Sequence, residues 1–562
     1  MLYAMENCLV EWSYSTGKKY TDPFNEVELS AVITDPDGRQ YDVPAFWAGD
    51  NTWRIRYASP KTGRHHFRTV CSDSSNADLH GREGEISITG YDGNNTLLRH
   101  GRLRVSKNGK HMEHADGKPF FWLGDTWWLG LVTRLGWPED FQLLAADRVK
   151  KGFSVIQIVA GLYPDMAPFD KRGTNEAGFP WDKDFSHINP GYFDAADLKI
   201  SWIVKSGFVP FIVGSWGYFL DFAGKAALKK HWRNLIARYG AYPVVWCLAG
   251  EATMPFYGSL EWTAEQNARY DTILRDQKKR EEYDTWAKAE WTDITEYARK
   301  TDPFHNPVTI HPVEFGHKTL DTSLLDIDLL CSSHNGWDSL TQTANTIEET
   351  MAFAPGIPVI VDEVAYEGIG GGCGPEIQRF LFWQSILSGT AGYTYGANGV
   401  WQINTKEGRY GVSPYGRTWG NTLWNEAYKL PGSEQLGICK RFLERYQWWR
   451  FEPHPEWSEP HAEKNRRILP YAAGIPGEVR MIYIPMLGYS GGTGGRPTIR
   501  GLEKGINYRA FFFDPATGEE YDIGDVTADE NGNWESPSMS RSSKVVPLYT
   551  DLLLVMENKS VK

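Results

Sequence analysis

The sequence predicts a multidomain α/β protein with a central (β/α)8 TIM barrel flanked by an N-terminal β-sandwich and a C-terminal β-sandwich. Two observations support this prediction. From Gly101 to Gly432 short apolar segments alternate with amphipathic helical segments, as in a parallel (β/α) fold. On either side of this region, short strand patterns are separated by turn residues. With 562 residues the chain is also too long for one hydrophobic core.

Residues 1–95 are expected to form the N-terminal sandwich. Their short alternating strands are separated by Asp-Gly, Gly-Asp-Asn and Thr-Gly turns. Phe46, Trp47 and Trp53 are interpreted as core or interdomain packing, with an exposed sugar-binding face as the alternative.

Residues 96–436 are expected to form the barrel. Eight strands are predicted, at 120–128, 154–161, 209–216, 244–251, 307–313, 327–336, 357–364 and 391–398. Helical patterns between them, at 138–152, 193–207, 225–240 and 375–389, end at a glycine before the next strand, as αβ loops do. The charged block 261–300 is interpreted as a solvated amphipathic helix that follows the fourth strand.

Residues 437–562 return to short strands and turns, after a helix and aromatic linker at 439–453. We therefore expect a C-terminal sandwich here. The glycine cluster at 488–495 is interpreted as a loop and not as a phosphate cradle, because no helix beginning with Gly-Lys-Ser/Thr follows it.

Composition excludes several classes of partner. The net charge of −12 argues against nucleic acid and against an anionic membrane surface, and no apolar segment reaches the length of a membrane span. No secretory signal is visible, and the six cysteines are scattered without CxxC pairs. We expect reduced thiols, a cytoplasmic location and no cofactor; the sequence leaves a homo-oligomer open.

Two carboxylates stand where a barrel places its reactive groups. Glu251 follows the apolar run 244–248, and Glu363 closes the run 358–361. A charge at the C-terminal end of a buried strand is costly unless the site uses it, and catalytic groups of barrels lie at that end. A pair of such carboxylates is what glycosidic bond cleavage requires. The 24 Trp and 28 Tyr residues also favour a carbohydrate ligand, because aromatic rings stack on sugars.

The two glutamates are assigned different roles. We expect Glu251 to be the acid/base and Glu363 the nucleophile. A separation of about 5–5.5 Å between their carboxyl groups would indicate retention of configuration, and about 6.5–9.5 Å inversion. Asp362 is expected on the other side of its strand, in a structural role.

Further polar and aromatic residues at strand ends are candidates for substrate binding. They are Asp125, Trp127, Trp128, Gln157, Trp216, His311, His334, Asn335, Tyr395 and Asn398. Structural roles remain open for several of them. Asp125 could be a helix cap or an ion-pair partner, His311 a satisfied rim histidine, and the His334-Asn335 pair part of a turn.

Three barrel motifs, PFFWLGDTWWLG, VVWCLAGE and PVIVDEVAYEG, resemble those of the apiosidase-like (DUF4038-type) glycoside hydrolases. The N-terminal segment, with FWAGDNTWRIRY, resembles the DUF5060-type sandwich that often precedes such barrels, and the C-terminal end a DUF5605-type sandwich. The resemblance implies that Glu363 matches the second catalytic carboxylate of the family. At residues 250–251 the family often has Gly-Asp, whereas this sequence has Gly-Glu. Related clan members have Asn-Glu at these positions, and their Asn, which Gly250 replaces here, contacts the sugar 2-hydroxyl.

The sequence therefore predicts a glycosidase, exo-acting and retaining, on the terminal sugar of a small plant-derived glycoside or oligosaccharide. A furanoside such as apiose or arabinofuranose is favoured. One alternative is a metal-dependent barrel hydrolase using Asp125, His311, His317 and His334, although no HxH or HExxH spacing supports it. The other is a non-catalytic carbohydrate-binding protein.

Overall fold

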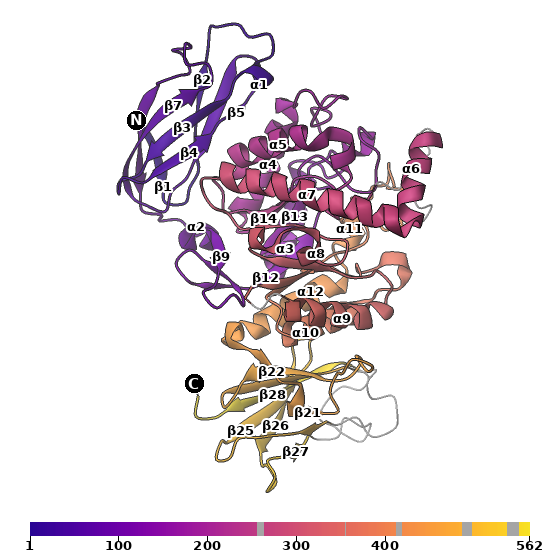
Figure 1. The fold of residues 1–562 in the computed structure, drawn as a ribbon. Helices are drawn as coiled ribbons and strands as arrows, with labels where there is room; N and C mark the ends of the chain where they lie inside the picture. Colours follow the sequence, from indigo (N-terminus) through magenta and orange to yellow (C-terminus); the bar gives the residue numbers. More distant parts are fainter. Residues whose placement is uncertain (256–263, 354–355, 412–418, 486–496, 537–549, 562) are drawn as a thin grey trace.

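The computed structural model describes residues 1–255, 264–353, 356–411, 419–485, 497–536 and 550–561 (Figure 1). A central barrel lies between two β-rich regions, one built from each end of the chain (Figure 1). The predicted glycine-rich loop at 488–495 falls outside the described residues.

The barrel is a sheet of eight parallel strands, in the order β16-β15-β14-β13-β12-β19-β18-β17. The strands are β12 (Trp122–Thr126), β13 (Val155–Val159), β14 (Val209–Val213), β15 (Val245–Cys247), β16 (Val308–Thr309), β17 (Asp328–Cys331), β18 (Val359–Glu363) and β19 (Gly392–Tyr395). Each lies within a predicted segment, so the prediction is confirmed. The Asp326 amide bonds to the Val308 carbonyl at 2.9 Å, and the Thr309 hydroxyl to the Ile327 carbonyl at 2.7 Å, which join the two end strands.

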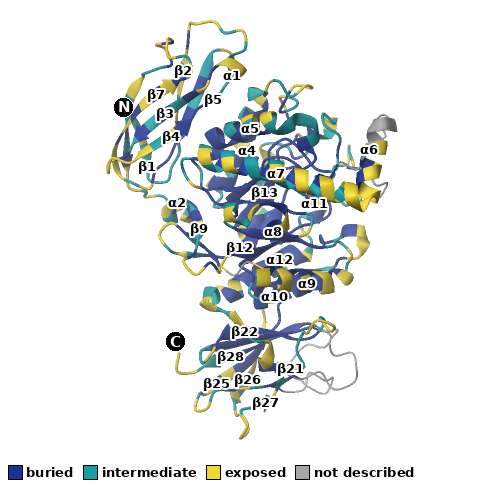
Figure 2. Cartoon of the chain, in the orientation of Figure 1, coloured by how far each residue is buried: buried dark blue, intermediate teal, exposed yellow. Residues whose placement is uncertain are grey.

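Helices cover the outside of the barrel (Figure 1). The larger ones are α3 (Glu139–Lys151), α4 (Pro190–Lys205), α5 (Phe219–Tyr239), α6 (Ala264–Arg275), α7 (Gln277–Thr301), α9 (Asp338–Phe353), α10 (Pro375–Leu387) and α12 (Pro431–Leu443). The predicted charged helix is α6 and α7 together. In α7, Tyr283, Ala287, Trp291, Ile294 and Ala298 are buried at helical spacing, while its outer face is exposed (Figure 2).

The N-terminal sandwich pairs a five-stranded sheet, in the order β1-β8-β7-β3-β4, with a three-stranded sheet, β2-β6-β5. The strands are β1 (Leu2–Met5), β2 (Val10–Ser15), β3 (Leu29–Thr34), β4 (Gln40–Pro44), β5 (Phe46–Trp47), β6 (Thr52–Tyr57), β7 (Gly63–Cys71) and β8 (Glu83–Thr89). Phe46 and Trp53 are buried, which supports the packing interpretation for them. A short helix α2 (Thr96–His100) and a small sheet, β9 (Leu103–Val105), β10 (Met112–His114) and β11 (Pro119–Phe120), lead into the barrel.

The C-terminal sandwich is a six-stranded sheet, β20-β22-β23-β28-β25-β26, and a three-stranded sheet, β21-β24-β27. The strands are β20 (Glu452–Pro453), β21 (Ser458–Glu459), β22 (Tyr471–Ile475), β23 (Val479–Ile484), β24 (Thr498–Ile499), β25 (Tyr508–Phe513), β26 (Glu520–Val526), β27 (Trp534–Glu535) and β28 (Leu552–Asn558). Arg379 of α10 pairs with Asp551 at 2.5 Å, and Phe442 of α12 stacks on Phe513 at 3.9 Å. These contacts join the sandwich to the barrel helices.

All six cysteines are free thiols. Among the described residues, no helix combines the length and the apolar character that crossing a bilayer requires.

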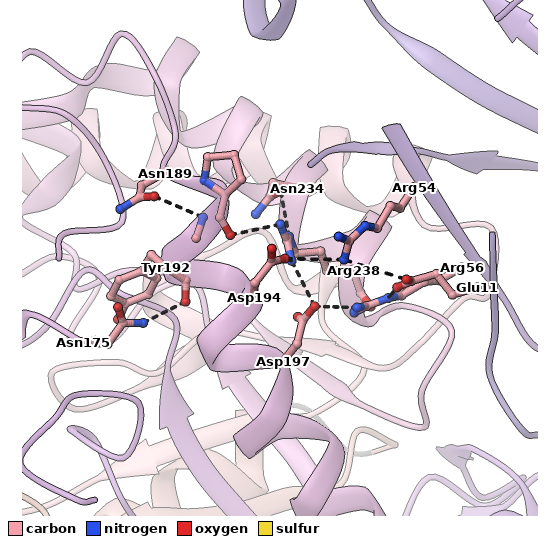
Figure 3. A network of polar contacts seen from close by, with 12 residues as sticks. Glu11, Arg54, Arg56, Asn175, Asn189, Tyr192, Asp194, Asp197, Asn234 and Arg238 are labelled. Atoms are coloured by element: carbon pink, nitrogen blue, oxygen red, sulfur yellow. Dashed lines mark hydrogen bonds and ion pairs between the residues drawn. The ribbon is translucent and has the colours of Figure 1, made fainter. Parts of the chain in front are cut away.

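A buried ion network attaches the N-terminal sandwich to the barrel (Figure 3). Asp197 of α4 contacts Arg56 of β6 at 2.5 Å and Arg238 of α5 at 3.0 Å. Arg56 also pairs with Glu11 of β2 at 2.7 Å, and Arg238 with Asp194 at 2.9 Å. Because Asp197 bridges two arginines with nearly inaccessible side chains, its loss would leave two buried cations short of a partner.

We therefore expect Asp197→Ala to lower the free energy of unfolding by ~3 kcal/mol, measured by urea denaturation of the full chain. The control is Glu282→Ala, which removes an exposed pair with Lys279 at 2.8 Å and should cost less than ~0.5 kcal/mol. Equal effects of the two substitutions would contradict a structural role for the network.

Candidate active site

A cavity of about 190 Å³ lies at the C-terminal ends of the barrel strands. Both predicted carboxylates line it. Its full lining is Trp128, Pro164, Asp165, Trp216, Glu251, Met254, His334, Glu363, Tyr366, Ile369, Trp401 and Trp419. The wall is thus mostly aromatic and apolar, with three carboxylates and one imidazole, the composition of a site for a polar ligand with apolar faces.

Glu251 lies four residues beyond the end of β15, in a strained backbone conformation. Its φ is +41°, a region that non-glycine residues occupy at a cost of about 1–3 kcal/mol. Backbone hydrogen bonds hold both sides of this residue: the Gly217 amide bonds to the Gly250 carbonyl at 2.7 Å, and the Met254 amide to the Glu251 carbonyl at 2.7 Å. The indole of Trp216 donates to Glu251 Oε2 at 2.9 Å. The carboxylate is therefore fixed in the cavity by its neighbours.

The environment of Glu251 favours its neutral form. Burial raises the pKa of the Glu251 carboxyl to about 7, and the negative charges of Glu363 and Asp165 act in the same direction. At neutral pH a large fraction of this side chain therefore carries a proton.

Glu363 is held as a carboxylate by two histidines. His311 Nε2 lies 3.0 Å from one carboxylate oxygen, and His334 Nε2 lies 3.0 Å from the other. Burial acts to raise the pKa of Glu363, but the contacts with His311 and His334 outweigh it and hold this pKa well below the usual range. Glu363 is therefore ionised at neutral pH.

His311 carries a positive charge because it lies between two carboxylates. Its Nδ1 is 2.5 Å from Asp362 Oδ2, on the side of the ring opposite Glu363. Burial disfavours the imidazolium, but the contacts with Asp362 and Glu363 raise the pKa of His311 to about 10. Asp362 also accepts a hydrogen bond from the Gln157 amide. Asp362 thus acts on the cavity through His311 and does not line it.

A β-bulge explains how two consecutive residues reach the same histidine. Strict alternation along a strand would send Asp362 and Glu363 to opposite sides. In the pairing of β17 with β18, however, Leu330 pairs with Val361 and Cys331 with Glu363, so Asp362 is an extra residue. Such a bulge redirects side chains, often beside active sites. The expectation that Asp362 points away from its neighbour is therefore corrected.

Aromatic side chains enclose the charged groups. Trp128 donates from its indole nitrogen to the Tyr366 hydroxyl at 3.0 Å and packs edge-to-face on Trp216 at 5.5 Å. The His311 ring lies 5.7 Å from each of these two indoles. These walls limit the water around the carboxylates, which is the cause of the desolvation at Glu251.

Several predicted binding residues are packed outside the cavity wall. Asp125 is fully buried and pairs with Arg148 at 2.6 Å, the ion-pair role that the sequence left open. The indole of Trp127 donates to the same Asp125 carboxylate at 2.6 Å. Gln157 points to Asp362. These three residues support the barrel strands beneath the cavity.

Some of the remaining predicted binding residues line the cavity, and others do not. The Tyr395 hydroxyl donates to Glu367 at 2.5 Å, and Asn398 accepts from the Gln402 amide at 2.7 Å. Asn335 is exposed, and its backbone amide bonds to the Ser339 hydroxyl in a turn. Trp128, Trp216 and His334 do line the cavity, while His311 reaches it through Glu363.

Sequence reasoning missed six cavity residues that lie beyond the predicted strands. They are Pro164, Asp165, Met254, Ile369, Trp401 and Trp419. Asp165 lies six residues after the end of β13 and has a φ of +53°. An acidic residue shortly after a barrel strand is a signal that could have identified Asp165, whereas the apolar residues carry no such signal.

Trp216 occupies the space next to Gly250. A Cβ at Gly250 would lie 2.3 Å from two carbon atoms of the Trp216 ring. No side chain, and so no asparagine, can stand at residue 250 while Trp216 keeps this position. The structure thus explains why the Asn of related barrels is replaced here by glycine.

The four residues of the predicted metal site, Asp125, His311, His317 and His334, do not surround one common position. His317 pairs with Asp328 at 2.9 Å, Asp125 with Arg148, and the other two histidines with Glu363. A different group, His311, Cys331 and Glu363, has possible donor atoms within 4.8 Å of one another. Metal ligation requires a neutral imidazole and a thiolate. Burial raises the pKa of the Cys331 thiol, and His311 is an imidazolium, so this donor set fits a metal poorly.

Comparison with known proteins places the chain among glycoside hydrolases. Residues 106–450 match the family described as "Apiosidase-like, catalytic domain", and residues 8–72 match a domain of unknown function, DUF5060. No curated protein matches the sequence. These matches favour an enzyme over a non-catalytic carbohydrate-binding protein.

Solved structures share the fold at low sequence identity. A glycoside hydrolase aligns with a TM-score of 0.63 and 20% identity, over 82% of this chain and 98% of its own. A glycoside hydrolase family 5 protein from Bacteroides vulgatus aligns with 0.64 and 20%, over 82% and 94%. A putative glycoside hydrolase from the same organism aligns with 0.65 and 16%, over 99% and 100%. At these identities the likeness supports the fold, including the arrangement of barrel and flanking sheets.

Replacing His311 should change the ionisation of Glu363. We expect His311→Gln to raise the pKa of Glu363, because the imidazolium is lost, and to shift the acid limb of the pH profile of kcat/KM to higher pH. A fall in kcat/KM of about 10²-fold is expected at neutral pH. The profile is measured on a nitrophenyl glycoside that the wild type cleaves.

The matched control is His317→Gln, which also removes a buried histidine paired with an aspartate but lies outside the cavity. Its acid limb should stay at the wild-type position. If both variants show the same profile, His311 has only a structural role.

Proposed function

The chain belongs to the apiosidase-like family of glycoside hydrolases, and we propose that it is a retaining, exo-acting glycosidase with Glu251 as acid/base and Glu363 as nucleophile. The observation that carries these assignments is the opposite ionisation of two carboxylates in one cavity. Burial raises the pKa of Glu251 to about 7, while the histidine contacts lower that of Glu363. Pairs of carboxyl groups whose environments separate their pKa values in this way divide acid and base roles between them.

The proposed reaction has two steps. First, a Glu363 oxygen attacks the anomeric carbon while Glu251 donates its proton to the leaving oxygen, which gives a glycosyl ester and a free alcohol. Second, Glu251, now a carboxylate, takes a proton from water, and the water oxygen displaces Glu363 from the anomeric carbon. Both carboxyl groups return to their starting protonation states.

The lowered pKa of Glu363 favours retention over inversion. In an inverting enzyme the second carboxylate must take a proton from water, and a group with a pKa far below the working pH is a poor general base. A nucleophile, in contrast, must be ionised and well oriented. The contacts from His311 and His334 to the two oxygens of Glu363 meet both requirements.

The size of the cavity supports exo-action on a terminal sugar. Its volume of about 190 Å³ lies below the ~300–1,000 Å³ of typical small-molecule pockets. Such a cavity suits one sugar ring better than an extended chain. We propose a terminal furanoside, apiose or arabinofuranose, on a small plant-derived glycoside. The match to the apiosidase-like family supports this choice.

We also propose a cytoplasmic location. Its support is the set of six free cysteines, five of them buried, which matches a reducing compartment.

Substitution of the two glutamates should separate their roles. Glu363→Gln should lower kcat on every substrate by on the order of 10⁴-fold or more, because the nucleophile is lost. Glu251→Gln should cost about 10²–10⁴-fold on alkyl glycosides and much less on nitrophenyl glycosides, whose leaving group needs little protonation. A screen of nitrophenyl furanosides and pyranosides identifies the sugar first.

The same screen tests the stereochemistry. With methanol as acceptor, a retaining enzyme forms the methyl glycoside of the starting anomeric configuration, visible by proton NMR. Formation of the opposite anomer would exclude the nucleophile role of Glu363, and near-normal turnover by either amide variant would exclude that residue's assignment.

Activity on an alkyl glycoside should decline as the pH rises above about 7. The acid form of Glu251 is needed, and its pKa of about 7 means that it is mostly protonated below this pH and mostly ionised above it. The alkaline limb of kcat/KM should therefore lie near pH 7 and be absent in Glu251→Gln. An alkaline limb that persists unchanged in this variant would assign the titration to another group.

A further inference from the structure

A second and larger cavity, of about 410 Å³, lies at the opposite end of the barrel from the carboxylates. Its wall includes Val359, the first residue of β18, and Thr390, two residues before β19 begins. Glu363 is the last residue of β18, so the strand itself separates the two cavities. A ligand in the second cavity therefore cannot reach the catalytic groups.

Aromatic residues of the segment between α12 and the C-terminal sandwich form one side of this cavity. Trp448, Trp449 and Phe451 line it, and all three are partly exposed. Trp448 is held edge-to-face by Phe121 at 4.8 Å and by Trp449 at 5.9 Å. The rings are thus positioned by packing and still accessible, a condition for stacking on a ligand.

The cavity also has polar groups without partners. His111 is 6% exposed, and its imidazole makes no hydrogen bond to any described residue. Thr390 is 7% exposed, and its hydroxyl has no partner within the described part of the chain. Leaving such groups unpaired costs about 1–3 kcal/mol each. At the rim, Lys110 pairs with Glu452 at 2.9 Å, and both side chains are exposed.

These features select the chemical class of the ligand. A wholly apolar ligand would leave His111 and Thr390 unpaired. An anion would meet Lys110, but Glu452 already neutralises that charge. A sugar has apolar ring faces for the tryptophans and hydroxyl groups that both donate and accept hydrogen bonds. The volume, within the ~300–1,000 Å³ of small-molecule sites, accommodates a short oligosaccharide.

We propose that this cavity is a second carbohydrate-binding site, separate from the catalytic one, with Trp449 and His111 as its principal contacts. It would hold part of a glycan while a terminal sugar is cleaved at the other end of the barrel or on a neighbouring molecule. The proposed function enters this inference only through the ligand class.

The test uses the full chain carrying Glu363→Gln, which prevents turnover, and three probes: arabinotriose, cellotriose and mannotriose. Binding is followed by isothermal titration calorimetry and by tryptophan fluorescence at millimolar concentrations. At least one probe should bind with an affinity that Trp449→Ala weakens tenfold or more and that Trp216→Phe, in the catalytic cavity, leaves unchanged. His111→Ala should weaken the same binding event.

Two controls keep the result interpretable. Trp449→Tyr preserves an aromatic face and should retain most of the affinity, and circular dichroism establishes that each variant is folded. If no probe shows binding that depends on both Trp449 and His111, the second site does not exist as proposed. Hydrolysis by the wild type without such binding overturns only this site, whereas such binding without hydrolysis overturns only the proposed function.

Discussion

The charge on His311 is the constraint from which the chemistry of the cavity follows. This side chain, just beyond β16, lies between Asp362 and Glu363 of β18, and its two ring nitrogens contact one carboxylate each. Its positive charge keeps Glu363 ionised. Burial, together with that negative charge, raises the pKa of Glu251 to about 7. The direct effect of His311 on Glu251 is smaller and lowers the pKa of that carboxyl, so the two glutamates differ because burial and the charge of Glu363 outweigh it at Glu251.

Most of the barrel could be predicted from the sequence because buried parallel strands have a simple signature. Each of the eight strands is a short apolar run, covered on both faces, and each was found within its predicted segment. The glycine endings were also informative: α3 ends at Gly152, whose φ of +83° only glycine adopts readily. The bulge at Asp362 was not predictable, since it depends on the pairing of β18 with β17 and not on any local pattern.

The candidate site was predictable only in part, and the reason is geometric. A strand-end position places a residue near the mouth of the barrel but does not determine the direction of its side chain. Asp125 lies near a strand end, as predicted. Its carboxylate, however, accepts a hydrogen bond from Arg148 of α3, which lies 23 positions away in the sequence. For residues in irregular segments, the position itself could not be predicted. Trp401 and Trp419 reach the cavity from irregular segments whose path no periodicity describes.

The close packing of Trp216 against Gly250 makes these two positions interdependent in evolution. A protein that gains an asparagine at 250 must lose the large indole at 216, and with it the hydrogen bond to Glu251. Neither single replacement is neutral: one produces a steric overlap, and the other removes a donor from the acid. Descent from an Asn-Glu ancestor to the present pair would therefore pass through a less active intermediate or require both changes together.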